Sequence, residues 1–244
     1  FAAAAEKAGD LIVTALLRDG YRLSHSWKDG RASGNGFLED YACVAEGLLA
    51  LYATTFSERW FAAARGLADT MLTHFARPDG GFFDTSDDHE SLIVRPRSLQ
   101  DSPTPSGNSL AATVLLKMAA YTGESRYLEF CRYVVKAWDE ASGPRILQTL
   151  LTEKQVNKTA NAKAYEMLSN LVGVCELVRA TGDRPLLDPV LIAWQDVATK
   201  RLYLTGSASQ SEHFHDDHEL PNQPDAHVAE TCVTTTWIQL NSQL

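Results

Sequence analysis

Apolar residues recur three and four positions apart over long windows of this sequence, whereas strict alternation of apolar and polar residues is almost absent. The first spacing gathers apolar side chains on one face of an α-helix, so the chain is predicted to be all-α. We predict about eight helices, at residues 2–19, 38–55, 57–76, 106–121, 124–139, 163–181, 184–202 and 229–244.

Very short turns join some of these helices: "YATTFSERW", "AAYTGESRYL" and "VRATGDRPLL". In the last two, Gly123 and Gly182 can adopt the left-handed conformation that ends a helix, and Ser125 and Asp183 can cap the next helix. Because turns this short force neighbouring helices to run antiparallel, the sequence predicts helical hairpins.

The hairpins are separated by longer connections rich in Gly, Pro and Asp, such as "SWKDGRASGNG" and "TGSASQSEHFHDDHELPNQPDAH". Tight turns at one end and long loops at the other are typical of an α/α toroid, in which inner and outer helices surround an axis. We therefore predict one toroid domain over residues 1–244, with any functional residues in its long loops.

Three full hairpins are predicted, at 38–76, 106–139 and 163–202. The end helices, 2–19 and 229–244, have no such partner. They could pair with each other and close a ring of four hairpins, which suits a monomer. Otherwise the chain is an open arc whose ends need a partner chain, as in a dimer.

Composition limits the ligands. The 244 residues are 45% hydrophobic, which is enough for a substantial core. The net charge is −9, without a basic run, so nucleic acid and anionic membranes have no electrostatic support as partners, and neutral sugars fit better. No stretch resembles a membrane span or a signal peptide, which predicts a cytoplasmic protein with free thiols. The chain begins without Met and stops inside a predicted helix, so we expect a piece of a longer protein.

Two families resemble different parts of the sequence. Residues 20 to about 126, with "GFLEDYACVAEGLLALYATTF" and "GGFFDTSDDHESLIVRPRSLQDSPTPSGNSLAA", resemble the α/α-toroid region of thioredoxin-domain-linked proteins related to spermatogenesis-associated protein 20. From about residue 124, "NAKAYEMLSNLVGVCELVRATGDRPLL" and "VAETCVTTTWIQLNSQL" resemble the β-L-arabinofuranosidase family of retaining glycoside hydrolases. Since "TGESRYL" suits both, we expect a chimera with a seam near residues 120–133.

The second resemblance implies a zinc ion held by one Glu and three Cys, with one thiolate as the nucleophile. Its Glu-Thr-Cys motif matches Glu230 and Cys232. Residues two apart lie on opposite sides of a helix, so both reach one ion only if this segment is extended. The family's other two ligands are an adjacent Cys pair downstream, which this chain lacks, so the zinc ligand set is incomplete. The alternative is a free thiol beside an ordinary first-turn carboxylate.

The same resemblance makes Glu212 in "SQSEHF" the general acid/base. This role requires a raised pKa, which burial would provide; the alternative is a solvated loop carboxylate. The resemblance also places His213 and His215 in the substrate pocket, while a His-x-His pair could instead bind a metal adventitiously.

In the first half, Asp40, Tyr41 and Asn108 lie where predicted helices begin. Such positions face the mouth of a toroid, and these side chains suit sugar hydroxyls and ring faces. Alternatively, Asp40 and Ser106 only cap helices.

Together these features predict a recombined or fragmentary toroid scaffold with a remnant carbohydrate pocket and without a complete catalytic site. The first alternative is an active glycosidase on β-L-arabinofuranosides, with a thiolate nucleophile and Glu212 as acid and base. The second is an interaction module without a ligand.

Overall fold

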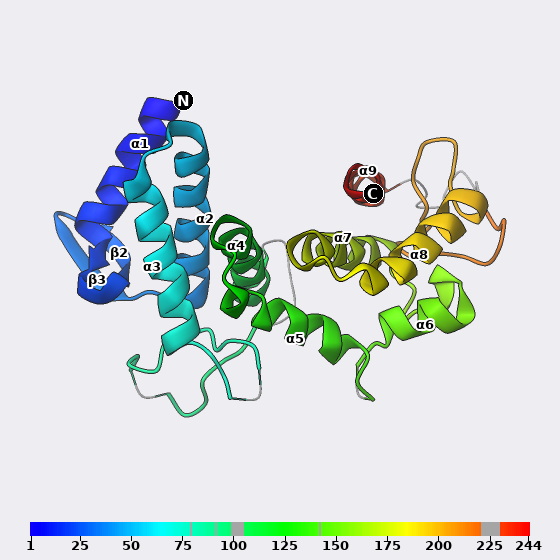
Figure 1. The fold of residues 1–244 in the computed structure, drawn as a ribbon, viewed down its shortest axis with the longest axis horizontal. Helices are drawn as coiled ribbons and strands as arrows, with labels where there is room; N and C mark the ends of the chain where they lie inside the picture. The colour runs from blue at the N-terminus through cyan, green and yellow to red at the C-terminus, as the bar shows by residue number, and fades with distance from the viewer. Residues whose placement is uncertain (79, 91, 99–104, 142, 221–229) are drawn as a thin grey trace. The chain divides into compact units, whose positions relative to one another are not determined.

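A computed structural model describes residues 1–78, 80–90, 92–98, 105–141, 143–220 and 230–244. These residues form nine α-helices and one small antiparallel sheet (Figure 1). The chain divides into two compact units, Phe1–Cys131 and Arg132–Leu244. The mainly helical prediction is confirmed, while the single domain over 1–244 stays a prediction. None of the helices in the described ranges is both long and apolar enough to cross a bilayer.

Unit 1 is built on the antiparallel hairpin of helices α2 (Leu38–Thr55) and α3 (Glu58–His74), against which α4 (Gly107–Thr122) packs. The predicted helix 38–55 has the bounds found in the structure. Apolar side chains at helical spacing bury fully in this unit, among them Leu48, Leu67, Met71, Leu115 and Met118.

The first helix, α1 (Ala2–Leu11), continues through one π-helical turn, Ile12–Leu16. It packs against α2 of the same unit. A Cβ atom at Gly9 would lie 2.7 Å from Leu51 Cδ1 and 3.2 Å from the Trp60 ring, so glycine gives this close approach without displacing either side chain. The predicted unpaired first helix is therefore wrong, because it has a partner within its own unit.

A three-stranded antiparallel sheet follows, which the sequence did not predict. Its strands are β1 (Leu17–Arg18), β2 (Arg22–Lys28) and β3 (Arg31–Asn35), in the order β1-β2-β3. The predicted helix 2–19 is therefore too long, and the predicted loop after residue 26 is a hairpin. Its turn is Asp29-Gly30, with φ of 50° and 78°, which the Asp-Gly pair favours.

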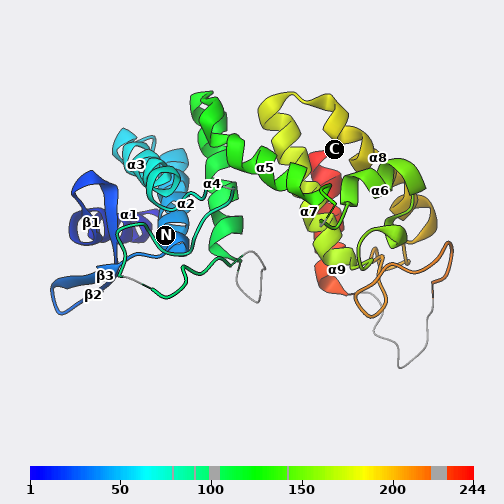
Figure 2. The ribbon, with the colours of Figure 1, turned by 90° about the horizontal axis from the view of Figure 1, so that it is seen from below.

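Unit 2 contains α6 (Ile146–Glu153), α7 (Ala164–Thr181), α8 (Leu187–Lys200) and α9 (Thr231–Gln243). Helix α7 packs against α8 and α9, and α6 packs against α8 (Figure 2). The last helix is thus also paired within its own unit, and closure of a ring by the two ends stays a prediction. Position 229, the predicted start of the last helix, lies outside the described residues.

Short 3-10 turns replace the ends of several predicted helices. Helix α5 spans Glu129–Trp138 and begins later than predicted, because Ser125–Tyr127 forms a separate 3-10 turn. Arg184–Leu186 forms a similar turn before α8, and Val156–Lys158 follows α6. Helix α6 itself was not predicted.

The three tight turns share the same pair of hydrogen bonds to a threonine hydroxyl. Thr55, Thr122 and Thr181 each end a helix and donate the side-chain hydroxyl to the carbonyl four residues earlier. The same oxygen accepts the backbone N–H two residues later, at 3.2–3.3 Å. Gly123 and Gly182 adopt the predicted left-handed conformation, with φ of 72°.

The predicted caps were wrong. The 3-10 turn at Ser125 follows Glu124, and the turn after Asp183 has no side-chain cap bond. The threonines accept the backbone N–H groups of Glu124 and Asp183, which lie just before these turns.

Candidate functional site

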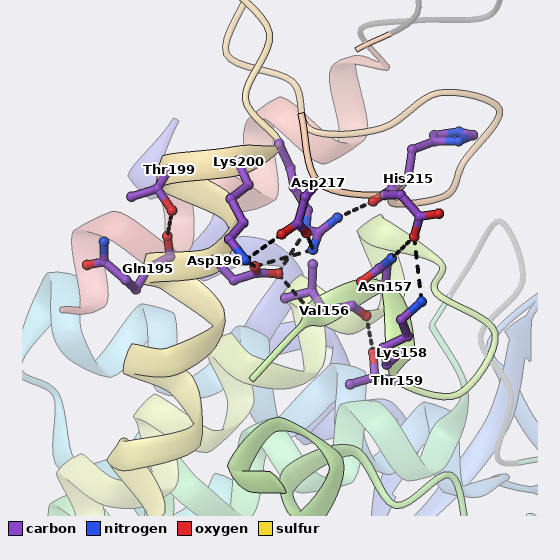
Figure 3. Close-up of polar contacts among 12 residues, drawn as sticks. Val156, Asn157, Lys158, Thr159, Gln195, Asp196, Thr199, Lys200, His215 and Asp217 are labelled. Atoms are coloured by element: carbon purple, nitrogen blue, oxygen red, sulfur yellow. Dashed lines mark hydrogen bonds and ion pairs between the residues drawn. The ribbon is translucent and has the colours of Figure 1, made fainter. Parts of the chain in front are cut away.

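The loop after α8 carries three of the predicted site residues, Glu212, His213 and His215. A buried ion network fixes where this loop begins (Figure 3). The Arg201 side chain is 2% exposed and donates Nε to Asp196 Oδ2 at 2.8 Å and Nη2 to Asp196 Oδ1 at 3.2 Å. Asp196 Oδ2 also accepts the backbone N–H of Val156 at 2.8 Å. A buried carboxylate is thus paired and hydrogen-bonded, as burial of a charge requires.

The same network reaches into the loop. Arg201 Nη1 donates to the His215 carbonyl, and Nη2 donates to Asp217 Oδ1 at 2.9 Å. Lys200 Nζ lies 2.7 Å from Asp217 Oδ2, and this hydrogen bond lowers the pKa of Asp217. Residues 215–217 are therefore held against the C-terminal end of α8.

Glu212 lies at the far turn of this loop, with φ of 71°. Its carbonyl accepts the N–H of Ala164 at 2.8 Å, which joins the loop to the start of α7. Its carboxylate is 58% exposed and lies 2.7 Å from Lys163 Nζ. The hydrogen bond from Lys163 lowers the pKa of Glu212. Glu212 is exposed and paired with a cation, so in this structure it lacks the raised pKa that the acid/base role requires.

The two predicted pocket histidines bond within their own loop. His213 Nδ1 lies 2.6 Å from the Ser211 carbonyl, and His215 Nε2 lies 3.1 Å from the Gln210 carbonyl. Because a carbonyl only accepts, each of these ring nitrogens carries the proton. The two histidines thus support the loop's own conformation.

Glu230 and Cys232 lie at the start of α9. Glu230 is the extended residue just before the helix, and Cys232 is an exposed thiol in the first turn. Glu230 Oε2 accepts from Ser209 Oγ at 2.7 Å, so this carboxylate also ties the loop to α9.

The donor set at this place falls short of a zinc site. Zinc sites in proteins use four ligands, or three and a water. In the described ranges, no three His, Cys, Asp or Glu side chains are grouped to hold a metal ion. Glu230 and Cys232 alone therefore do not fit zinc.

In unit 1, Asp40 and Tyr41 have well-defined structural partners. Asp40 Oδ2 accepts the N–H of Phe37 at 2.8 Å, which caps α2, and lies 2.7 Å from His25 Nδ1. Tyr41 is 1% exposed, and its hydroxyl accepts the N–H of Leu23 at 2.8 Å. Asp40 is thus a cap, as the alternative stated, while Tyr41 joins α2 to β2.

Asn108 is buried at the start of α4. Its Oδ1 accepts the Phe82 N–H at 2.9 Å, and its Nδ2 donates to the Phe82 and Ser98 carbonyls at 3.2 Å and 3.0 Å. Ser106 caps α4 through Ser109 N–H, as predicted. With its amide satisfied by the loop before α4, Asn108 organises that loop.

Sequence reasoning missed two pairs. The first is the ion pair Asp196–Arg201. An Asp in the middle of an apolar helical stretch could have indicated it. The second is the pair His25–Asp40, which joins an exposed strand to a helix cap. No local sequence pattern indicates it, because the two residues are 15 positions apart.

Comparison with known proteins bears on both units. The family model for the GH127 catalytic domain of β-L-arabinofuranosidases matches residues 43–244. Spermatogenesis-associated protein 20 of Mus musculus is 34% identical over 131 residues, covering 50% of this chain and 17% of that protein. The non-reducing end β-L-arabinofuranosidase of Bifidobacterium longum subsp. longum is 24% identical over 223 residues, covering 82% of this chain and 30% of that protein.

A solved GH127 β-L-arabinofuranosidase from Geobacillus stearothermophilus T6 has a TM-score of 0.53 at 19% identity, over 84% of this chain and 32% of that one. This likeness confirms the predicted fold class of helical hairpins. The chain spans between 17% and 30% of the length of the curated relatives described above. The match from residue 43 also crosses the predicted seam, so the arabinofuranosidase likeness is not limited to the second half.

Proposed function

Because this chain belongs to the GH127 catalytic-domain family of β-L-arabinofuranosidases, we propose that it supplies a carbohydrate-binding part of such a domain and that its described residues hold no complete catalytic site. Sugar binding is supported by family membership, and the net charge of −9 gives anionic partners no electrostatic support. The absence of a complete catalytic site is supported by the surroundings of Glu212, Glu230 and Cys232.

The state of Glu212 is the observation that carries this proposal. A general acid must hold a proton near neutral pH, so its pKa must be raised. The ion pair with Lys163 does the opposite, since it favours the charged carboxylate. As it stands, Glu212 suits the binding of a hydroxyl group better than the protonation of a leaving sugar oxygen.

The group of residues that would supply the nucleophile is also incomplete. Cys232 is exposed in the first turn of α9, and Glu230 is engaged by Ser209. Retaining glycosidases place nucleophile and acid/base at a fixed separation across the sugar. Further donors, beyond those that this chain groups in its described residues, would be needed to complete the site.

A thermal shift experiment tests binding. L-Arabinose and methyl β-L-arabinofuranoside are added to the protein, and the melting temperature is followed as sugar rises. A ligand that binds only the folded protein stabilises it by about 1.4 kcal/mol at ten times its Kd, which raises Tm by about 3–6 °C for a chain of this size. A saturable rise is expected, and its absence with both sugars overturns the proposal.

The family favours one alternative, an active retaining glycosidase on β-L-arabinofuranosides. Release of nitrophenol from an aryl β-L-arabinofuranoside separates it from the main proposal. We expect no release above the blank. Turnover that is lost in both Cys232→Ala and Glu212→Gln would establish the alternative instead.

A further inference from the structure

Unit 1 contains a cleft of about 600 Å³ that none of the predicted site residues line. This volume lies in the range of about 300–1,000 Å³ that is usual for small-molecule sites. Its walls come from the β-sheet, from the residue before α2, and from the loop at 89–90. The lining residues are Arg18, Ser24, His25, Ala32, Ser33, Gly34, Asn35, Phe37, His89 and Glu90.

His25, which lines this cleft, is held in one orientation. Its Nδ1 lies 2.7 Å from Asp40 Oδ2, and the same oxygen is fixed by the N–H of Phe37 at 2.8 Å. Because an ionised carboxylate only accepts hydrogen bonds, His25 carries its proton on Nδ1. The Nε2 atom of the neutral ring is then an acceptor, and it has no partner among the described residues.

Three rings form one wall of the cleft. The Phe37 ring contacts His25 with centroids 5.1 Å apart, edge to face, and contacts His89 with centroids 5.4 Å apart. His89 Nδ1 is buried and has no hydrogen-bond partner in the part of the chain that the structure describes. This nitrogen is covered by the protein, so His89 contributes its ring, and not a hydrogen bond, to the cleft.

Other residues that line the cleft are polar. Arg18 Nη2 donates to Asn35 Oδ1 at 2.9 Å, which orients both side chains. Among the lining residues, Arg18 and Glu90 carry the permanent charges, and these charges cancel. The cleft therefore favours a neutral ligand over an anion or a cation.

An aromatic face beside several hydroxyl-binding groups matches one ligand chemistry. We propose that this cleft binds a neutral monosaccharide or its glycoside. The C–H face of the sugar packs on Phe37, one hydroxyl donates to His25 Nε2, and the polar lining side chains of Ser33 and Asn35 offer further partners. Asp40 is the positioning residue, since it fixes the His25 ring. This assignment rests on the proposed function for the class of ligand, and it adds the place of binding.

The test compares two matched His–Asp pairs of unit 1. His74 Nδ1 lies 2.8 Å from Asp87 Oδ1, and His74 does not line the cleft. His25→Ala and His74→Ala therefore each remove one imidazole from one carboxylate. L-Arabinose binding is measured by calorimetry for the wild type and both variants, and Tm without sugar reports whether each variant is folded.

We expect His25→Ala to weaken L-arabinose binding about tenfold or more, the effect of one lost hydrogen bond plus ring contact, while His74→Ala binds as the wild type does. A second readout uses the unchanged protein, so it holds even if a variant fails to fold. The imidazole C–H signals of His25 and His89 should shift with L-arabinose in NMR spectra, whereas the signal of His74 should stay in place.

The experiments distinguish failure of the cleft assignment from failure of the proposed function. Binding by the wild type that survives His25→Ala, or that leaves the His25 and His89 signals unmoved, overturns the cleft assignment and leaves the proposed function intact. A wild type that binds neither arabinoside overturns both. Tighter binding of D-galacturonate than of L-arabinose contradicts the neutral character assigned to the cleft.

Discussion

The substitution Arg201→Met tests how the loop that carries Glu212 is held. It removes four hydrogen bonds, two to Asp196, one to the His215 carbonyl and one to Asp217. Methionine keeps most of the aliphatic part of the arginine side chain. The loss of stability therefore reflects the removed ion pairs and hydrogen bonds more than a new cavity.

The magnitude follows from burial. The side chains of Arg201 and Asp196 are each 2% exposed, and removal of one partner from a buried ion pair typically costs about 3–5 kcal/mol. Asp196 keeps the Val156 N–H and lies 3.3 Å from Lys200 Nζ, which compensates part of the loss. We therefore expect the lower end, about 3 kcal/mol in the free energy of unfolding.

Urea denaturation followed by far-UV circular dichroism measures this free energy. Arg179→Met is the matched control, because Arg179 lies in the same unit and pairs with Glu176, but is 56% exposed. An exposed pair contributes little, so the control should lose less than about 0.5 kcal/mol. In the double variant with Asp196→Asn, the loss should fall short of the sum of the single losses by about 1–3 kcal/mol.

Two results would refute this reasoning. One is a loss for Arg201→Met that does not exceed that of Arg179→Met. The other is strict additivity with Asp196→Asn, since independent side chains, and not a coupled pair, give additive losses. Hydrogen exchange of residues 201–220 should accelerate in Arg201→Met, because the His215 carbonyl loses its donor.

The remaining predictions concern thiols and a buried tyrosine. Burial raises the pKa of Cys131 to about 12 and also raises the pKa of Cys175, so a thiol reagent at neutral pH should label only the two exposed cysteines until the chain unfolds, and mass spectrometry counts the labels. Native labelling of all four thiols would contradict this. Burial and the hydrogen bond to Asp69 raise the pKa of Tyr127 to about 12 from 10.0, so this stabilisation is present below pH 10 and is lost as pH rises towards 12. Urea midpoints should therefore fall less steeply over that pH range in Tyr127→Phe than in the wild type; parallel curves would oppose this assignment.

The helices were predictable because their signal is local. A helix repeats every 3.6 residues, so a buried face marks itself within one segment, as it does for α2. The turns at Gly123 and Gly182 were predictable for the same reason, since left-handed backbone conformation selects glycine at one position. The Thr55, Thr122 and Thr181 device was also readable in principle, as a threonine two residues before each cap.

The sheet was missed because its strands are mostly exposed. Residues 25–28 of β2 and 31–34 of β3 are exposed on both faces, so no alternation of apolar and polar residues marks them. The Asp29-Gly30 pair was the available signal, and it was absorbed into a predicted loop. Helix α6 was missed because its eight residues cover little more than two turns.

The sequence by itself determined most of the helical segments, the tight turns between them, and the family of domains that they resemble. It also named Glu212, Glu230 and Cys232. Only the tertiary structure decided what surrounds such residues, because a pKa or a binding geometry depends on neighbours that are remote along the chain. His25 contacts Asp40, which is 15 positions away in the sequence, and Ser209 contacts Glu230, which is 21 positions away. No local pattern encodes such meetings, since they exist only after the apolar faces have packed.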